Sequence, residues 1–451
     1  MAMLMDIKKT LNPAPTRAQL LARVFNVLDR QQIAWCVLHG YESWPQQIGN
    51  DVDLLVDPRL LPNDLAKTLY AHRDEIGAEP VLWLNDGAQF IVLCARGEGS
   101  PIILQLHVSG NYSMRGRTFY EGAEILAARE RRDNFWIPAP HHEFGAVLVN
   151  RILKQKLRPE HETKLSSLVT NHPAACEREA RRFFPAADVR IIMQAARAKD
   201  WARVHRYAKD LRRGMLKEGH ASRDAGQVNA IGRRIARWMI PPCGLHVVFL
   251  GPDGVGKSTV IEAVRHDLAP IFLREKYLTF APGLLPSKFE ALKPDGPHSL
   301  PPRSYPASLV KAAWWSVCYT LGYLVTIHSA LARATFVVNH RYLPDAIVDP
   351  KRYRYSGPQW ILRALWRIAP KPHLLILLDA PPEVIQARKK EVAPEETARQ
   401  REGYRALANE CPFAHIVDNS RSLPEVVGEI EQIILDFMAI RTAHQRKAAI
   451  A

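Results

Sequence analysis

The segment GPDGVGKST, at residues 251–259, has the residue types and the spacing of a phosphate-binding loop. Gly251, Gly256, Lys257 and Ser258 satisfy the pattern GxxxxGK[ST], with an apolar run before the pattern and a helical run after it. Glycines let the backbone turn its N–H groups toward phosphate oxygens, a lysine reaches the β- and γ-phosphates, and a serine hydroxyl binds Mg²⁺. The spacing therefore predicts ATP or GTP binding. The expected nucleotide-contacting residues are Gly251, Gly254, Val255, Gly256, Lys257, Ser258 and Thr259.

Three later segments accompany this loop, namely VVNHRYLPDAIVDPKRYRY, HLLILLDAPPEVIQARKKE and IVDNSRSLPEVVGEIEQII. Together with the loop they resemble the thymidylate kinase family of nucleoside monophosphate kinases, over about residues 245–437. The resemblance implies catalytic roles for Lys257 and for three further residues. Asp253 would contact the sugar hydroxyl of the acceptor, Arg341 would hold the acceptor phosphate, and Arg388 would bring positive charge to the transferred group.

The chain departs from this family at one informative position. It reads His340-Arg341-Tyr342 where the family has Asp-Arg-Tyr. The family uses the missing carboxylate near Mg²⁺, and Asp345 or Asp349 is a candidate substitute, with Asp345 the expected metal ligand. Phosphoryl transfer depends mainly on positioning and charge neutralisation. Two alternatives therefore stay open: a working kinase, or an ATP-binding protein with altered or lost catalysis.

A second set of candidate residues lies in LHGYESWPQQIGNDVDLLVD. Asp51 and Asp53 are two apart on an expected strand, so both carboxylates project from the same face. Paired carboxylates of this kind hold Mg²⁺ for nucleotidyl transfer. The arrangement resembles the nucleotidyltransferase fold over about residues 18–160, which implies that Asp51 and Asp53 are metal ligands.

This second match is also incomplete. Tyr41 stands in place of the serine of that family, and Gln105 stands where a third carboxylate is expected. His107 lies two residues after Gln105 and is either a metal ligand or a core histidine. Active nucleotidyl transfer, a degenerate binding or scaffolding domain, and a solvated strand end with no ligand are the three alternatives.

The elements that must position these residues predict an α/β protein. We expect a C-terminal P-loop parallel sheet with flanking helices, an N-terminal mixed α/β nucleotidyltransferase-like domain, and a basic helical connector. The expected boundaries are 1–172 for the first domain, 173–242 for the connector, 243–440 for the P-loop domain and 441–451 for a polar tail. The proline-rich stretch 282–306 reads as a long loop or lid, and it holds no clear base-recognising residue.

The formal net charge of +15 is concentrated in one region. Residues 177–237 carry 16 Lys and Arg against 7 Asp and Glu. Such a field attracts phosphates, nucleic acid or an acidic membrane, and it is also typical of a solvated helical face. No named nucleic-acid motif accompanies it, so we do not expect a nucleic-acid partner.

One stretch, from Ala312 to Ile327, is bounded by Lys311 and His328 and contains no charged residue, but it spans only 16 residues, whereas a membrane span needs about 20. It predicts a buried or groove-lining helix and no transmembrane segment, with a peripheral membrane contact left open. Six singly spread cysteines fit a reducing cytoplasm and do not fit a zinc site. The first 15 residues lack the apolar core of a signal peptide, so we expect a cytoplasmic protein.

These features predict an ATP- and Mg²⁺-dependent small-molecule kinase resembling thymidylate kinase. Its expected partner is a small-molecule phosphate acceptor, either a nucleoside monophosphate or a related phosphorylated metabolite, and a homodimer is left open. The alternative is an ATP-binding regulatory or scaffold protein with a degenerate kinase core and a degenerate nucleotidyltransferase-like domain.

Overall fold

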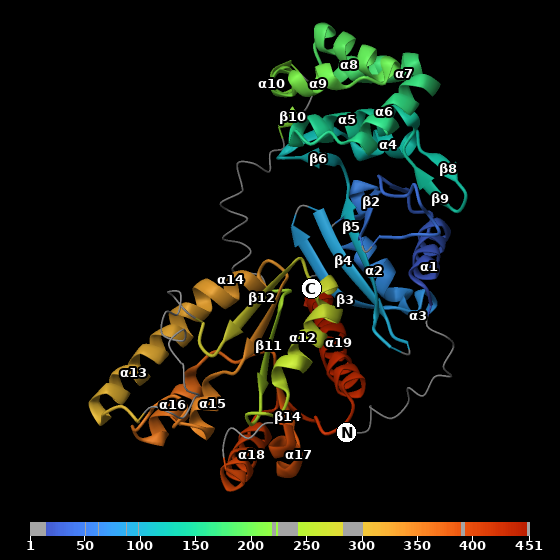
Figure 1. The fold of residues 1–451 in the computed structure, drawn as a ribbon. Helices are drawn as coiled ribbons and strands as arrows, with labels where there is room; N and C mark the ends of the chain where they lie inside the picture. Colours follow the sequence, from blue (N-terminus) through green and yellow to red (C-terminus); the bar gives the residue numbers. More distant parts are fainter. Residues whose placement is uncertain are drawn as a thin grey trace. The chain divides into compact units, whose positions relative to one another are not determined.

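The computed structural model describes residues 15–49, 51–61, 63–86, 88–97, 99–218, 222–223, 242–282, 301–388 and 393–448. The chain forms two compact units, an N-terminal unit built mainly from residues 14–233 and a C-terminal unit built mainly from residues 234–448. The predicted fold class is confirmed: the protein is α/β, with an N-terminal mixed sheet, a helical middle and an all-parallel C-terminal sheet with flanking helices (Figure 1).

A five-stranded mixed sheet in the order β1-β2-β5-β4-β3 lies at the centre of the N-terminal unit. The strands are β1 (Trp35–Val37), β2 (Asp51–Val56), β3 (Glu79–Asp86), β4 (Ala88–Ala95) and β5 (Ile102–Ser109), and the accompanying helices are α1 (Arg17–Arg30), η1 (Pro58–Leu60), α2 (Asp64–Ala71) and α3 (Arg73–Ile76). β2 and β5 are parallel, and the other neighbouring pairs are antiparallel. Burial alternates along β5, which leaves Gln105 and His107 together on its more open face.

Short strands and one helix join this sheet to the helical middle. They are β6 (Tyr112–Met114), β7 (Arg117–Tyr120), α4 (Gly122–Ala127), β8 (Glu130–Arg132) and β9 (Phe135–Ile137). β7 also pairs with β10 (Ser222–Arg223), and β8 pairs with β9.

Six helices form the helical middle: α5 (Pro140–Lys154), α6 (Pro159–Asn171), α7 (Pro173–Phe183), α8 (Ala186–Ala198), α9 (Ala202–Arg206) and α10 (Ala208–Glu218). A proline begins each of α5, α6 and α7, where its missing N–H has no helical partner to lose. α7 to α10 share one hydrophobic core with α5 and α6. Beyond α10, the structure describes only β10 and residue 242 of the predicted connector.

Five parallel strands in the order β12-β13-β11-β14-β15 form the sheet of the C-terminal unit. They are β11 (Leu245–Leu250), β12 (Arg274–Thr279), β13 (Thr335–His340), β14 (Leu374–Asp379) and β15 (Ala414–Asp418). Every residue of β11 and β14 is buried, as expected for parallel strands covered on both faces. The carboxyl ends of β13, β11 and β14 are neighbours, so the segments that follow them meet at one edge of the sheet.

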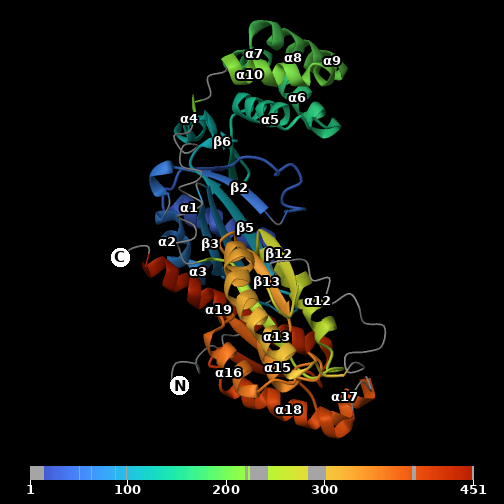
Figure 2. The ribbon, with the colours of Figure 1, turned by 90° about the vertical axis from the view of Figure 1, so that its left-hand side faces the viewer.

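Helices cover both faces of this sheet. They are α12 (Lys257–Leu268), η3 (Ala269–Ile271), α13 (Tyr305–Val317), η4 (Cys318–His328), α14 (Ser329–Leu331), α15 (Leu343–Val348), α16 (Gln359–Ile368), α17 (Pro382–Arg388), α18 (Pro394–Asn409) and α19 (Leu423–Ala448). α12 and α19 pack against each other on one side, and α13, α15 and α16 lie on the other (Figure 1). Figure 2 shows the same sheet with α13, α15 and α16 turned toward the viewer.

The predicted buried or groove-lining helix at residues 312–327 is helical but only half-buried. It belongs to α13 and to the π-helical continuation η4. Trp315 and Tyr319 are buried, whereas Val317, Leu321 and Val325 are exposed. Burial is thus found on one face of the helix, and a helical spacing of four places the three exposed apolar side chains together on the other face. The groove-lining alternative stays a prediction. Within the described ranges, no helix is long and apolar enough to cross a membrane.

The last helix extends beyond residue 440, the predicted domain end. α19 continues through Ala448, so residues 441–448 of the predicted polar tail are helical. Arg441 anchors this part of the helix, because its guanidinium donates hydrogen bonds to the carbonyl oxygens of Cys243 (2.7 Å) and Gly244 (2.8 Å).

Candidate functional site

The glycine-rich loop, residues 251–256, connects the carboxyl end of β11 to the first residue of α12. Gly251, Gly254 and Gly256 have φ angles of 144°, 83° and 103°, which side chains rarely tolerate. A Cβ atom on Gly251 would lie only 2.4 Å from the carbonyl oxygen of Leu378 in β14. Gly251 is therefore required both for the turn and for the close approach of the loop to the neighbouring strand.

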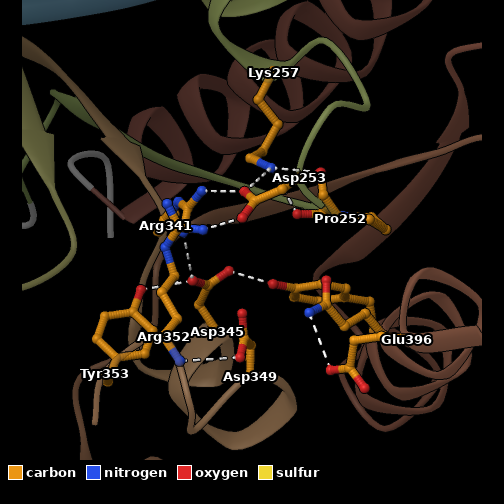
Figure 3. Close-up of polar contacts among 12 residues, drawn as sticks. Pro252, Asp253, Lys257, Arg341, Asp345, Asp349, Arg352, Tyr353 and Glu396 are labelled. Atoms are coloured by element: carbon orange, nitrogen blue, oxygen red, sulfur yellow. Dashed lines mark hydrogen bonds and ion pairs between the residues drawn. The ribbon is translucent and has the colours of Figure 1, made fainter. Parts of the chain in front are cut away.

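Lys257 begins α12 and folds back over this loop. Its Nζ atom donates hydrogen bonds to the carbonyl oxygens of Gly251 (2.7 Å) and Pro252 (2.8 Å), and it lies 3.9 Å from Oδ1 of Asp253 (Figure 3). Ser258, the next residue, is exposed in the first turn of the helix. A buried lysine ammonium, an exposed hydroxyl and the N-terminus of a helix thus meet at one point, an arrangement suited to an anion with an associated cation.

Asp253 lies at the centre of a charge network at the carboxyl edge of the sheet. Its two carboxylate oxygens accept hydrogen bonds from the guanidinium groups of Arg341 and Arg352 (Figure 3). Burial opposes the charge on Arg341, but Asp345 and Asp253 outweigh burial and raise the pKa of Arg341 above its ordinary value. Arg341 also has a positive φ of 78°, which is uncommon for this residue type. Arg352 was not predicted from the sequence, although this arginine lies within a segment that carries the family resemblance.

Asp345 is the most enclosed carboxylate of this network. It accepts hydrogen bonds from the hydroxyl groups of Tyr353 (2.6 Å) and Tyr404, and its Oδ2 lies 3.4 Å from Nη1 of Arg341. Burial, followed by the charge of Asp345, raises the pKa of both tyrosines well above the ordinary value. With both of its oxygens engaged, Asp345 is arranged to position Arg341. Asp349, the other candidate substitute, is buried and accepts the backbone N–H of Arg352 (3.1 Å).

His340, at the carboxyl end of β13, stands beside this network. Burial, followed by the positive charges of Lys257 and Arg341, lowers the pKa of His340 to about 4. Its imidazole is therefore neutral near pH 7 and supplies none of the negative charge that an aspartate would supply there. Among the described residues, its Nε2 atom has no hydrogen-bond partner.

Arg388 reaches the glycine-rich loop from the end of α17. Its Nη1 atom donates hydrogen bonds to the carbonyl oxygens of Val255 (3.1 Å) and Asn419 (2.9 Å). The side-chain amide of Asn419, which follows β15, also donates to the carbonyl of Val255. The structure therefore brings Arg388 to the predicted loop, and it adds Asn419, which sequence reasoning did not single out. Lys389 and Lys390 lie outside the described residues.

Asp379 is a further carboxylate at this edge, at the last position of β14. It pairs with Arg401 of α18, whose Nε and Nη2 atoms lie 2.7 and 3.1 Å from the carboxylate oxygens, and Arg405 lies 3.5 Å away. Its backbone carbonyl accepts the N–H of Asn419 (2.7 Å). An aspartate that ends a buried apolar strand was the signal in the sequence that could have identified it.

The candidate residues of the N-terminal unit lie on two adjacent parallel strands. Asp51 is directly opposite Gln105, and Asp53 is directly opposite His107. Asp51 is exposed, Asp53 is partly exposed, and Nδ1 of His39 lies 3.4 Å from Oδ2 of Asp53. The two carboxylates could share a divalent cation, but Gln105, which lies opposite Asp51, carries a neutral amide and adds no negative charge.

Tyr41 occupies the place of the serine of the resembled nucleotidyltransferases, and it is part of the core. Its side chain is buried, and its hydroxyl donates a hydrogen bond to Glu143 of α5. Lys164 lies 2.6 Å from the same glutamate. Through these contacts the Tyr41 side chain joins the motif to α5 of the helical middle.

The C-terminal site thus brings together all four predicted catalytic residues, while Asp51 and Asp53 belong to a separate site in the N-terminal unit. No protein-family model matches this sequence, and none of the curated proteins is significantly similar to it.

Proposed function

We propose that the C-terminal unit binds ATP with Mg²⁺ and transfers the γ-phosphoryl group to a phosphorylated small molecule. A nucleoside monophosphate or a related phosphorylated metabolite is the proposed acceptor. The observation that carries the proposal is the convergence of three cationic side chains from separate elements, Lys257, Arg341 and Arg388, on one glycine-rich loop and its surroundings.

The glycine-rich loop and Lys257 are proposed to hold the phosphates of ATP. The loop presents backbone N–H groups, and α12 adds the positive end of its dipole. Lys257 would exchange the carbonyl oxygens of Gly251 and Pro252 for phosphate oxygens, a short movement because its Nζ already lies over the loop. Ser258 would hold Mg²⁺, which supplies charge neutralisation when it is bound.

Arg341 and Asp253 are proposed to hold the acceptor. Asp253 fixes the planar guanidinium groups of Arg341 and Arg352, and guanidinium groups bind phosphate through two parallel hydrogen bonds. Asp345 also contacts the guanidinium of Arg341 and helps to hold it in place. Phosphoryl transfer needs mainly this positioning and charge neutralisation, so the chemistry does not depend on one further carboxylate.

A second candidate function is an ATP-binding regulatory or scaffold protein. His340 favours it, because a neutral imidazole stands where the resembled family has a carboxylate near the transferred phosphate. In the N-terminal unit, Gln105 opposite Asp51 supports the same view for a degenerate nucleotidyltransferase-like domain.

Release of ADP separates the two candidates. The full chain would be incubated with ATP and Mg²⁺ and a panel of nucleoside monophosphates, sugars and sugar phosphates, with Lys257→Ala as the loss-of-function variant. Lys209→Ala, an exposed lysine of α10, is the matched control. Acceptor-dependent release lost only in Lys257→Ala supports the kinase. ATP binding without release supports the regulatory protein, and absence of ATP binding rules out both.

A further inference from the structure

A cluster of metal-ligating side chains lies in the helical middle of the N-terminal unit, apart from both sites described above. His141 and His142 lie in the first turn of α5, and Glu179 lies on α7, which packs against α5. One ligand atom from each of these three residues lies within 4.8 Å of the other two. Two imidazoles and one carboxylate form a donor set that binds zinc and similar transition metals.

His142 is oriented as a metal-binding histidine would be. Its side chain is only 3% exposed, and its Nε2 atom lies 3.4 Å from Oε1 of Glu124 in α4. In metal sites the second ring nitrogen of a ligating histidine usually donates to a carboxylate in this way. The other nitrogen, Nδ1, is buried and has no hydrogen-bond partner within the described part of the chain.

Glu124 is itself held in place. Both of its carboxylate oxygens accept hydrogen bonds from Arg182 of α7, one of them at 2.8 Å. An arginine therefore fixes the carboxylate, and the carboxylate fixes the imidazole. This arrangement sets which ring nitrogen of His142 is left as an electron-pair donor.

Glu179 supplies the carboxylate of the cluster. The residue is 8% exposed, and its Oε1 atom has no hydrogen bond of regular geometry to any described residue. Its neighbours are Nη1 of Arg182, at 3.7 Å, and the hydroxyl of Tyr120, with which the carboxylate interacts. Gly145 makes room for it, because a Cβ there would lie 3.0 Å from Cγ of Glu179 and would overlap the hydroxyl of Tyr120. A buried polar atom without a partner is costly and uncommon, and Nδ1 of His142 is such an atom among the described residues.

We propose that His141, His142 and Glu179 bind one divalent transition-metal ion, for which zinc is the best chemical match. The expected ligand atoms are Nδ1 of His142 and Oε1 of Glu179, completed by an imidazole nitrogen of His141. Because ligand distances to zinc are about 2.0–2.2 Å, the three side chains draw closer on binding. His141 is partly exposed, so water reaches the remaining coordination position from its side. The ion would clamp the start of α5 to α7.

Metal titration of the full chain tests this proposal. Chelator-treated protein would be titrated with Zn²⁺ by calorimetry and with Co²⁺ by visible absorption. We expect one ion per chain and a cobalt spectrum without a thiolate charge-transfer band, because the site contains no cysteine. Zinc should also raise the melting temperature of the protein. Absence of stoichiometric binding, or a thiolate band, would overturn the proposal.

Three variants distinguish this site from other metal-binding groups. His142→Ala and the nearly isosteric Glu179→Gln should each weaken binding by more than the roughly 10- to 100-fold typical of losing an outer-shell partner. His266→Ala, an exposed histidine of the C-terminal unit, should bind as the wild type does. Circular dichroism checks folding, and Glu179→Gln decides the matter if His142→Ala does not fold. Unchanged zinc affinity in Glu179→Gln would contradict the proposal.

Discussion

The guanidinium of Arg388 donates a hydrogen bond to the carbonyl oxygen of Val255, at 3.1 Å, so the end of α17 is tied to the glycine-rich loop. The same Nη1 atom donates to the carbonyl of Asn419 (2.9 Å), and Asn419 in turn donates to Val255. One arginine thus links the segments after β11, β14 and β15. The positive charge that the proposed reaction needs is therefore already adjacent to the loop.

Replacing Arg388 should reduce turnover more than nucleotide binding. Arg388→Ala removes a charge beside the proposed transferred group, and we expect kcat to fall by about 10²–10³-fold, as for other single groups that stabilise transition-state charge. The Kd for ATP should change much less, because the loop and Lys257 remain. Steady-state kinetics and calorimetry measure the two quantities. Equal losses of kcat and of ATP affinity would mean that Arg388 only supports the loop.

Substitution of Gly251 should be far more damaging than substitution of a helical glycine. Gly251→Ala introduces a Cβ 2.4 Å from the carbonyl of Leu378 at a φ of 144°, and we expect ATP binding to be lost and stability to fall by at least about 1–3 kcal/mol. Gly428→Ala is the control, because a Cβ there meets no atom within 4 Å. Helix propensity predicts neutral or slightly increased stability for this control. Urea unfolding and ATP titration compare the two variants. Equal stability and equal ATP affinity in the two variants would contradict the loop geometry.

Asp345 should matter more for stability than an exposed aspartate does. Asp345→Asn leaves the charge of Arg341 less compensated and disturbs two buried tyrosine hydroxyls, so we expect a loss of about 3–5 kcal/mol. Asp210→Asn removes an exposed pair with Arg213 and should cost less than about 1 kcal/mol. Denaturant midpoints measure both effects. A small loss of stability in Asp345→Asn would show that the carboxylate does not hold the network together.

Two histidines with lowered pKa values, the buried His246 and the half-buried His373, should make the C-terminal unit sensitive to acid. Burial lowers the pKa of His246 to about 4 and, together with Arg441, that of His373 to about 3. Nδ1 of His373 accepts the backbone N–H of His246 (3.0 Å), which requires a neutral ring. Because both folded values lie below the unfolded value of about 6.5, the unfolded chain binds more protons. Above about pH 6.5 the two histidines are neutral in both states and do not lower the free energy of unfolding. As the pH falls toward 4, the free energy of unfolding decreases.

The variant His373→Asn checks the origin of this pH dependence. An asparagine oxygen can accept the same N–H without titrating, so the free energy of unfolding should decrease less steeply with falling pH than in the wild type. Melting temperatures measured from pH 4 to pH 8 give the comparison. Identical slopes in the two proteins would show that His373 does not contribute.

The strands that end at the candidate site could be predicted because their signals are local. The buried run before Gly251, the spacing of Lys257 and the alternation that places Asp51 and Asp53 on one face of β2 are properties of neighbouring residues. Arg352 and Asn419 could not be predicted from such signals. Each depends on the parallel order of the sheet, which brings together segments separated by about one hundred residues or more. The same holds for Arg441, whose contacts with Cys243 and Gly244 anchor the last part of α19.

The most direct test of the proposed kinase activity is acceptor-dependent release of ADP by the full chain in the presence of ATP and Mg²⁺. We expect one phosphorylated acceptor to stimulate release, and we expect Lys257→Ala to reduce this stimulated rate by orders of magnitude while circular dichroism and the melting temperature stay close to those of the wild type. Undiminished release by a folded Lys257→Ala protein would overturn the proposed activity.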